Sequence, residues 1–189
     1  CINGTGILNS WVKKYIGANT NYTTMNEMAA SIPAGSDGLN ILPFGNGAER
    51  IFNNKIIGAQ VLGLDLNKHT AAPIYRAAQE GIAFAFRYGL DIMRENKLQP
   101  SVIKAGQANL FLSPVFTHAF VNATGVPVAL YNVEGSVGAA LGAGIGAGIY
   151  KELKDAFADT KPIQRIEPTE TKLYNALYEN WKDKLVKFI

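Results

Sequence analysis

Two glycine-rich turns in this 189-residue chain combine backbone N–H groups with amide side chains, as a site for a flat or anionic ligand would. The run Asn3-Gly4-Thr5-Gly6 opens a helix-forming stretch, and free N–H groups at a helix start attract anions. The run Ala105-Gly106-Gln107-Ala108-Asn109 follows a strand and precedes a helix, where open α/β sheets bind ligands. There Gly106 permits close approach of the backbone, while Gln107 and Asn109 offer amide groups to a base or ribose. An ordinary turn is the equally supported alternative, because Gly and Asn tolerate unusual backbone angles.

A third glycine run, Gly142-Ala143-Gly144-Ile145-Gly146-Ala147, matches the dinucleotide pattern G-x-G-x-x-A. That pattern operates at a strand-to-helix turn, where backbone N–H groups meet a pyrophosphate. Here the glycines fall well inside a predicted helix, so we predict that they allow close packing on a neighbouring element. A dinucleotide-dependent oxidoreductase is the competing hypothesis, and a helix running unbroken through 142–148 would remove it.

Charged pairs supply the remaining candidates. Glu49 and Arg50 are adjacent in a polar loop, where a carboxylate beside a guanidinium could hold the hydroxyl groups of a polar substrate. A surface ion pair is the alternative interpretation. Glu80 and Arg87 share one face of the longest predicted helix, and we expect Glu80 to be partly buried. The sequence contains no nucleophile elbow, no P-loop lysine motif and no cluster of metal-ligating residues.

Composition and charge exclude several classes of protein. The formal net charge is +3 with 17% charged residues, and the basic residues are scattered, whereas nucleic-acid-binding proteins cluster them. Cys1 is the only cysteine, so no disulfide forms within the chain, and no signal peptide is seen; we expect a cytoplasmic protein. The uncharged stretch 137–150 has 14 residues, fewer than the roughly 20 that span a membrane. Because the chain starts at Cys1 without an initiator methionine, we interpret it as a fragment.

Hydrophobic periodicity and turn signals predict alternating helices and strands. The expected helices cover 6–16, 24–31, 70–94, 113–123, 133–158 and 168–188, and the expected strands cover 39–44, 60–66, 101–104 and 126–131. The longest helix is predicted to begin after Thr70, with Pro73 in its first turn. The polar segment 159–168, which carries two prolines, is the predicted linker. Alternation of this kind indicates an α/β domain in which helices cover a sheet.

Six segments, in this order, resemble the C-terminal domain of the FGGY carbohydrate kinases, and most nearly that of the xylulokinases. They are GTGILNSW (4–11), LNILPFGNGAER (39–50), IYRAAQEGIAFAFR (74–87), IKAGQANLFLSPVF (103–116), TGVPV (124–128) and EGSVGAALGAGIGAG (134–148). The patterns R-A-x-x-E-G-I-A-F and E-x-x-x-x-A-A-L-G-A are the most specific. With their spacing, the segments cover most of the chain.

The resemblance implies an actin-like ATPase domain of the ribonuclease-H type, with residues 1–158 as the nucleotide-binding domain. Residues 159–189 would form a linker and a C-terminal helix that packs on the same domain. The implied partner is the N-terminal domain of the same kinase, which carries the catalytic aspartate and most contacts to the sugar. The implied reaction transfers the γ-phosphoryl group of ATP, with Mg²⁺, to a hydroxyl of D-xylulose or a related pentulose. The resemblance also allows a homodimer.

Mapped residue by residue, the resemblance assigns nucleotide binding to two sets of positions and no catalytic residue or metal ligand to this chain. The first set is Gly6 and Ser10; the second is Ala105, Gly106, Gln107, Asn109 and Ser113. Either Asn109 or Ser113 takes the polar role, because A-G-Q-A-N replaces the relatives' G-G-G-A turn. Glu49 and Arg50 fall on the substrate side, although the relatives' W-D-P segment is missing. These departures motivate an alternative, a degenerate actin-like module that has a binding or structural role and no kinase activity.

Overall fold

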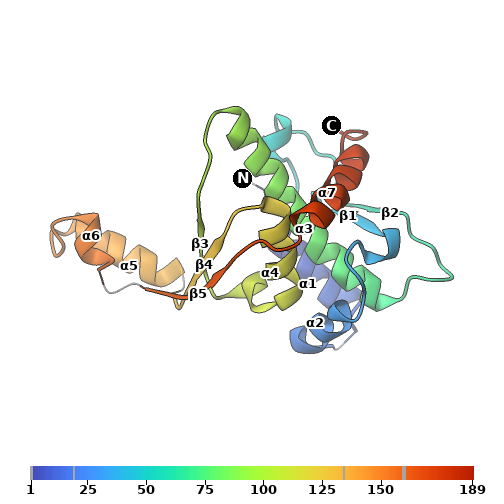
Figure 1. Ribbon diagram of the computed structural model, residues 1–189, viewed down its shortest axis with the longest axis horizontal. Coiled ribbons are helices and arrows are strands. Elements are labelled where there is room, and N and C mark those ends of the chain that lie inside the picture. Colours follow the sequence, from blue (N-terminus) through green and yellow to red (C-terminus); the bar gives the residue numbers. More distant parts are fainter. Residues whose placement is uncertain (1, 19, 134, 159–160) are drawn as a thin grey trace.

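The computed structural model describes residues 2–18, 20–133, 135–158 and 161–189. Cys1, Glu134, which opens the last of the six segments, and residues 159–160 of the predicted linker lie outside the described residues. Figure 1 shows a body of helices gathered around one long helix, with a sheet beside it from which a helical arm extends. The chain is therefore an α/β structure in which helices predominate.

The elements follow the predicted order, with additions in the second half. The helices are α1 (Thr5–Tyr15), α2 (Tyr22–Ala30), α3 (Ala71–Glu95), α4 (Pro114–Thr124), α5 (Gly135–Gly146), α6 (Leu153–Ala156) and α7 (Thr171–Leu185). The strands are β1 (Asn40–Leu42), β2 (Gln60–Leu62), β3 (Ile103–Gly106), β4 (Val128–Tyr131) and β5 (Pro162–Ile166). Three short 3₁₀ turns are η1 (Ser36–Gly38), η2 (Arg50–Phe52) and η3 (Asn109–Leu112).

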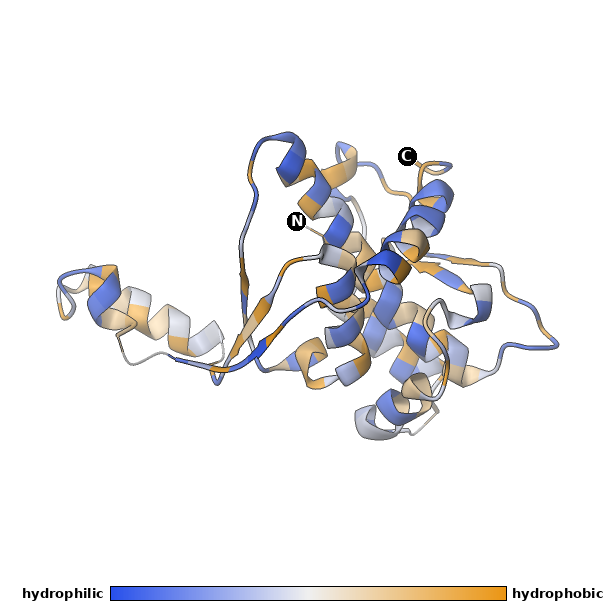
Figure 2. Ribbon diagram, viewed as in Figure 1, coloured by the Kyte–Doolittle hydropathy of each residue, from blue (hydrophilic) through white to orange (hydrophobic). Residues whose placement is uncertain are grey.

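Helix α3 lies at the centre of the body. Its own side chains are small or apolar over most of its length, so other elements can pack on it from several sides. It contacts α1, α2, α4, α7 and β1, and the residues from Ala77 to Ala85 are all buried. The helix begins directly after Thr70, as predicted, although the Thr70 side chain makes no capping hydrogen bond. Figure 2 shows hydrophobic and hydrophilic residues alternating along the helices of the body. A helix apolar over so much of its circumference is stable only in such a position.

The sheet beside the body joins three strands in the order β3-β4-β5, and β1 and β2 form a separate antiparallel pair. β3 and β4 are parallel, whereas β5 is antiparallel to β4. The linker prediction was wrong for Pro162–Ile166, which form β5. All residues of β5 except Ile166 are exposed, so no alternation of apolar and polar residues marked this strand in the sequence. Pairing with the open edge of β4 decides its structure.

The glycine-rich helix departs from two predictions. It ends at Gly146 rather than at 158; Gly148 has a φ of +75°, and Ile149 N donates to Gly144 O. Together with α6, helix α5 extends away from the body (Figure 1). Most of α5 has the pale colours of weakly hydrophobic residues (Figure 2). A Cβ added at Gly138, Gly142 or Gly146 would meet no atom within 4 Å in the described part of the chain. Close packing through these three glycines therefore does not occur within the described residues. Gly144 does pack closely, because a Cβ there would lie 2.8 Å from Tyr150 Cε2.

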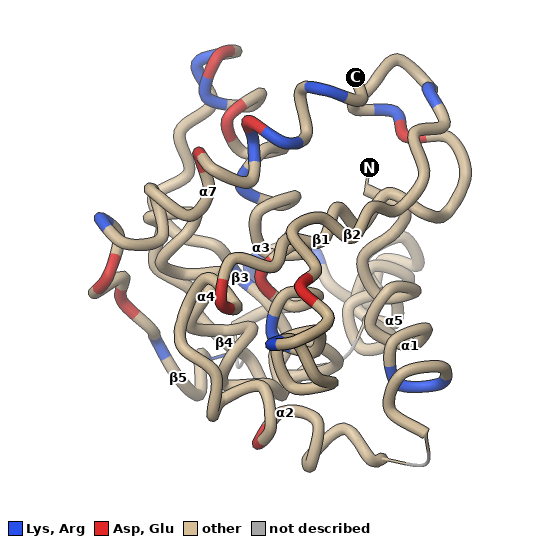
Figure 3. The backbone as a smooth tube through the Cα atoms, turned by 90° about the vertical axis from the view of Figure 1, so that its right-hand side faces the viewer, with Lys and Arg blue, Asp and Glu red and all other residues tan. Residues whose placement is uncertain are grey.

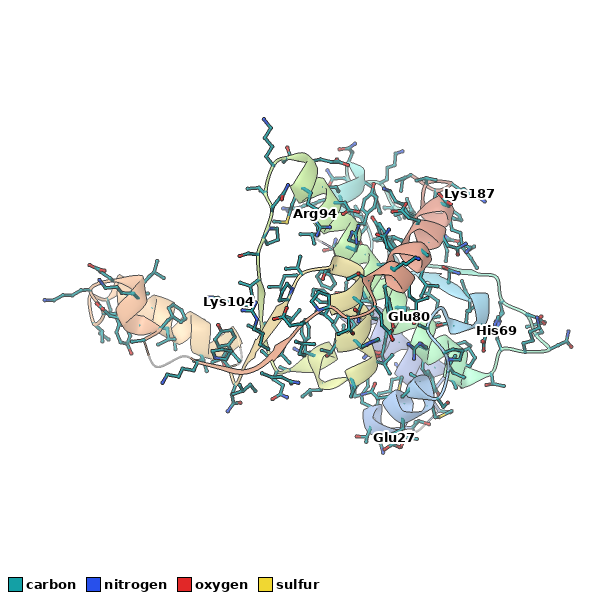
Figure 4. The ribbon with its side chains drawn as sticks, in the orientation of Figure 1. Glu27, His69, Glu80, Arg94, Lys104 and Lys187 are labelled. Carbon is teal, nitrogen blue, oxygen red and sulfur yellow. The ribbon has the colours of Figure 1, made fainter. Side chains whose placement is uncertain are left out.

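The R-A-x-x-E-G pattern in α3 contains a buried ion pair that holds the fold together. Arg76 Nε lies 2.8 Å from Glu80 Oε1, and both side chains are less than 10% exposed. The Glu80 carboxylate also accepts hydrogen bonds from Gly35 N and Ser36 Oγ, which ties η1 to α3. Figure 4 shows Glu80 in the middle of the body. Glu80 is thus more completely buried than the sequence predicted, at 2% exposure, and its charge is balanced by Arg76.

Gly81 lets β1 lie directly against α3. A Cβ at this position would lie 2.1 Å from the carbonyl oxygen of Ile41, so no other residue fits without displacing β1. The same Ile41 oxygen accepts a hydrogen bond from Trp181 Nε1 of α7 at 2.9 Å. One backbone carbonyl therefore joins β1, α3 and α7.

The division of the chain into two parts at residue 158 remains a prediction.

Asp91 links α3 to α7, and its removal should weaken the fold in a pH-dependent way. Burial raises the pKa of its carboxyl, but hydrogen bonds from Tyr178, Arg87 and Arg94 and the charge of Arg87 outweigh this effect and hold the pKa below its ordinary value. A depressed pKa stabilises the fold above the unfolded value and loses this effect as pH falls through the folded value. We expect Asp91→Asn to lower the free energy of unfolding at pH 7 by about 2 kcal/mol.

Urea denaturation measures this difference at pH 7 and again at about pH 3.5, near the ordinary pKa of a carboxyl. The difference in free energy of unfolding between the variant and the unaltered chain should become smaller at the lower pH. The reason is that the Asp91 carboxylate is then increasingly protonated in both the folded and the unfolded state. Asp183→Asn, at an exposed position of α7, is the control and should change little. An equal gap at both pH values would contradict a contribution from the ionised carboxyl.

Candidate functional site

A large cleft lies where the carboxyl ends of the parallel strands β3 and β4 face the N-terminal helices. Its volume is about 1150 Å³, enough for a ligand the size of a nucleotide. Its walls come from α1 and α2 on one side, from β3, η3 and the start of α4 on another, and from the first part of α5. The position agrees with the rule that open α/β sheets bind ligands beyond the carboxyl ends of their strands.

The cleft brings together residues from both predicted sets. Five of the seven predicted nucleotide-binding residues line it, namely Gly6, Ala105, Gly106, Asn109 and Ser113. The other two, Ser10 and Gln107, are exposed and lie outside its lining. About 100 residues separate the two sets in the sequence, so only the tertiary structure places them at one site. Whether these residues bind a ligand remains a prediction.

The first turn is held in place by buried groups behind it. A Cβ at Gly4 would lie 1.4 Å from the carbonyl oxygen of Pro43, so Gly4 is needed where the chain crosses the loop after β1. Glu49 is fully buried, and its carboxylate accepts two hydrogen bonds from Asn3 N, at 3.0 and 3.2 Å. By contrast, a side chain at Gly6 would meet no atom within 4 Å, because Gly6 faces the open cleft.

Glu49 and Arg50 do not act as the pair that their sequence suggested. Glu49 turns inward to Asn3, whereas Arg50 is exposed, and neither lines the cleft. Both the hydroxyl-binding pair and the surface ion pair require the two side chains to meet, and no ion pair between them is found in the described residues. Glu49 instead supports the first glycine turn. The assignment of this loop to the substrate side remains a prediction.

The second turn is shaped by contacts between β3 and β4. Gln107 N donates to Tyr131 O at 2.8 Å, and a Cβ at Gly106 would lie 2.3 Å from Val133 O. Gly106 therefore permits a close backbone contact inside the protein, and its replacement would disturb the turn as well as any ligand. Asn109 has a φ of +53°, a left-handed conformation that asparagine tolerates, and is exposed in the cleft.

Ser113 and Asn109 differ in how free their polar groups are. Ser113 is 3% exposed, caps α4 by accepting a hydrogen bond from Phe116 N, and donates its hydroxyl to Gln79 Oε1 at 2.6 Å. Its hydrogen-bonding capacity is largely used within the protein. Asn109 has an exposed amide in the same wall. The geometry therefore favours Asn109 over Ser113 for a polar contact with a ligand.

The sequence interpretation missed the wall that α1 and α2 contribute. Asn9, Tyr22 and Asn26 line the cleft beside Thr5 and Gly6. Tyr22 and Asn26 are four residues apart on α2 and so share one helix face, a spacing that could have indicated a common surface. The signal was weak, because α2 is short and polar and its partner elements are distant in sequence.

The lining of the cleft is neutral. Among the described residues that line it, none is Asp, Glu, Lys, Arg or His. Backbone N–H groups, amides and apolar side chains can position a ligand, but they cannot exchange protons with it near neutral pH. No group of three or more His, Cys, Asp or Glu side chains that could hold a metal ion occurs among the described residues. The arrangement suits binding rather than acid–base chemistry.

The charged residues of the described part of the chain are spread over many elements. In Figure 3 the basic and acidic segments are interspersed over several elements, as the scattered sequence positions predicted. In the part of the chain that the structure describes, no helix has the length and hydropathy needed to cross a membrane. Helix α5 ends at Gly146, so it does not run unbroken through residue 148. Gly142, Gly144 and Gly146 nevertheless lie inside α5 and not at a strand-to-helix turn, which counts against the dinucleotide hypothesis.

Comparison with known proteins gives a consistent family. The family described as "FGGY family of carbohydrate kinases, C-terminal domain" matches residues 1–147. A xylulose kinase of Haemophilus influenzae is 38% identical over 86 residues, 46% of this chain and 17% of that protein. An L-xylulose/3-keto-L-gulonate kinase of Escherichia coli is 28% identical over 170 residues, 85% of this chain and 32% of that protein.

A crystal structure of ligand-bound xylulose kinase from Lactobacillus acidophilus has the same fold. The match between the two structures has a TM-score of 0.83 at 22% sequence identity, and it covers 98% of this chain and 38% of that one. The predicted α/β, actin-like ATPase fold is thereby confirmed. This chain spans about a third or less of the length of the two curated relatives it matches.

Proposed function

Because this chain belongs to the FGGY family of carbohydrate kinases, whose C-terminal domain it represents, we propose that it forms the ATP-binding half of a sugar kinase. The observation that carries the proposal is the cleft in which the two predicted glycine turns meet. One of these turns opens a helix and the other follows a parallel strand, and both arrangements favour a nucleotide. The neutral, partly aromatic lining supports binding of a nucleoside.

The residues of the cleft would divide the nucleotide between them. The N–H groups at the start of α1, beside Gly6, would face the phosphates, since a helix N-terminus favours negative charge. Asn109 would offer its amide to the base or the ribose, and Phe111 and Leu112 would cover an apolar face of it. Ser113 would act indirectly by fixing the start of α4. Ser10 and Gln107, outside the cleft, have no role in this proposal.

Mg²⁺ and ATP together would supply phosphoryl transfer to a sugar hydroxyl, the reaction that the family name implies. The described residues of this chain offer no carboxylate at the cleft, so they would hold the metal only through the phosphates. Their own contribution is to orient the nucleotide and to exclude water from it. The catalytic base and the sugar contacts would come from the N-terminal domain of the same kinase.

D-Xylulose or a related pentulose is the proposed sugar, because curated relatives of this chain are named as kinases of xylulose sugars. In the loop predicted to face the sugar, Arg50 is exposed and available, whereas Glu49 is committed to Asn3. Residues 1–158 are the proposed nucleotide-binding domain, and residues 159–189 the proposed linker and C-terminal helix that packs on the same domain. A homodimer remains part of the proposal.

Titration of the chain with ADP, followed by calorimetry, tests the binding half of the proposal. Saturable binding in a one-to-one ratio is expected.

The alternative function, a degenerate actin-like module without kinase activity, is motivated by the A-G-Q-A-N turn and the missing W-D-P segment. It would be favoured by an absence of binding, or by a longer protein with an intact N-terminal domain that phosphorylates no pentulose.

The isolated chain should show no sugar-dependent turnover of ATP. The reason is chemical, because no side chain among the described residues of the cleft can accept the proton of a sugar hydroxyl. A coupled assay for ADP release, with and without D-xylulose, measures this. Nucleotide binding by the same preparation is the positive control for folding, and turnover that rises with sugar concentration would contradict the prediction.

A further inference from the structure

Three polar side chains form a hydrogen-bonded relay from the start of α4 to the wall of the cleft. Ser113 Oγ lies 2.6 Å from Gln79 Oε1, and Gln79 Nε2 lies 3.0 Å from Asn26 Oδ1. Ser113 and Gln79 are 3% and 1% exposed, whereas Asn26 is half-buried and lines the cleft. The relay therefore leads from the interior of the protein to a group that a ligand can reach.

The hydrogen bonds of the relay run in one direction. Ser113 Oγ accepts from the backbone N–H of Phe116 and donates to Gln79 Oε1. The amide of Gln79 then presents its NH₂ group to Asn26, whose oxygen accepts. This leaves the Asn26 Nδ2 group, a donor, for the cleft. No hydrogen bond from that nitrogen is found within the described part of the chain.

The surroundings of Asn26 suit the nucleoside part of a nucleotide better than its phosphates. Tyr22, one turn earlier on α2, lines the same wall with a flat aromatic ring, and Lys13 Nζ lies over this ring at 4.9 Å from its centroid. The relay connects Asn26 to Ser113, on the wall where Asn109 and Phe111 also lie. No lysine or arginine stands among the described residues that line the cleft.

We infer that Asn26 is a positioning residue for the nucleotide, donating its Nδ2–H to a ring nitrogen of the base or to a ribose oxygen. Gln79 and Ser113 hold it in this orientation. The inference rests on the proposed function, since it takes the ligand to be an adenine nucleotide. A donor held in one orientation before binding loses little conformational entropy when the ligand arrives, so its hydrogen bond contributes more to affinity.

The test reverses the group that faces the cleft while keeping its shape. Asn26→Asp retains an oxygen to accept from Gln79 Nε2 but presents an acceptor to the ligand. Thr23→Asp adds the same charge at an exposed position of α2 outside the cleft and is the matched control. Asn26→Ala removes both groups and favours the helix, which guards against a folding defect in the first variant. Calorimetric titration with ADP and with adenosine separates the nucleoside from the phosphates.

Both Asn26 variants should bind ADP and adenosine at least about tenfold more weakly than the unaltered chain, and Thr23→Asp should bind them normally. Thermal unfolding should show all three variants folded. Unchanged affinity in both Asn26 variants, or an equal loss in Thr23→Asp, would overturn the inference. A loss for ADP without a loss for adenosine would also overturn it, because Asn26 would then face the phosphates. If the unaltered chain binds neither ligand, the proposed function itself fails and the inference falls with it.

Discussion

Replacing Glu80 with alanine is expected to lower the free energy of unfolding by about 3–5 kcal/mol. The substitution leaves the Arg76 guanidinium charge in a site where that residue is 8% exposed, with no carboxylate beside it. It also removes the acceptor for Ser36 Oγ and Gly35 N, which hold η1 against α3. For a domain of this size the midpoint of thermal unfolding should fall by about 10 °C or more.

Differential scanning calorimetry or urea denaturation measures the loss of stability. Glu27→Ala, at an exposed position of α2, is the control. A second variant, Arg76→Met combined with Glu80→Leu, removes both charges and should recover part of the stability, because no buried charge is then left unpaired. A loss no larger than that of Glu27→Ala would show that η1 and α3 are held by other contacts.

Replacing Gly6 with leucine is expected to weaken ADP binding by about 100-fold, which corresponds to about 2.7 kcal/mol. Gly6 lines the cleft in the first turn of α1, and a Cβ there meets no atom within 4 Å, so the side chain would occupy space proposed for the nucleotide. The fold should tolerate the change for the same reason. Gly106 is a poorer probe, since a Cβ there would meet Val133 O at 2.3 Å.

Calorimetric titration with ADP measures the effect, and Gly142→Leu is the matched control. Gly142 is also a helical glycine with open space around its Cβ position, but it does not line the cleft. Gly6→Ala should fall between the unaltered chain and the leucine variant, because a methyl group fills less of the cleft. Normal ADP affinity in Gly6→Leu would place the nucleotide elsewhere.

Local sequence signals predicted the elements whose burial is strongly periodic. Helix α3 begins after Thr70 as expected, and α4 begins at Pro114 with Ser113 as its cap. Such elements carry their own start signals and an apolar face, so they can be read from nearby residues. β5 carries neither, and α5 ends where Gly148 turns to a positive φ, a change that its run of small residues did not mark.

The candidate site was predictable only in parts. Gly6, Gly106 and Asn109 were predicted because they stand beside a helix start or a strand end, where α/β proteins bind ligands, although an ordinary turn explains the Gly106–Asn109 stretch equally well. Ser10 was expected to bind together with Gly6, four residues earlier on the same face of α1, but Asn9 and not Ser10 joins the lining of the cleft. Asn26 was missed because the role inferred for it depends on a hydrogen bond from Gln79, which is 53 residues away in the sequence.

By itself, the sequence determined the α/β class, the family and the two glycine turns, because these depend on local patterns and on their order along the chain. Only the tertiary structure decided what the patterns do. It placed Gly6 and Gly106 in one cleft and left Glu49 buried against Asn3, away from Arg50. The physical reason is that hydrogen bonds, burial and close backbone contacts act between residues adjacent in space, whatever their separation in the chain.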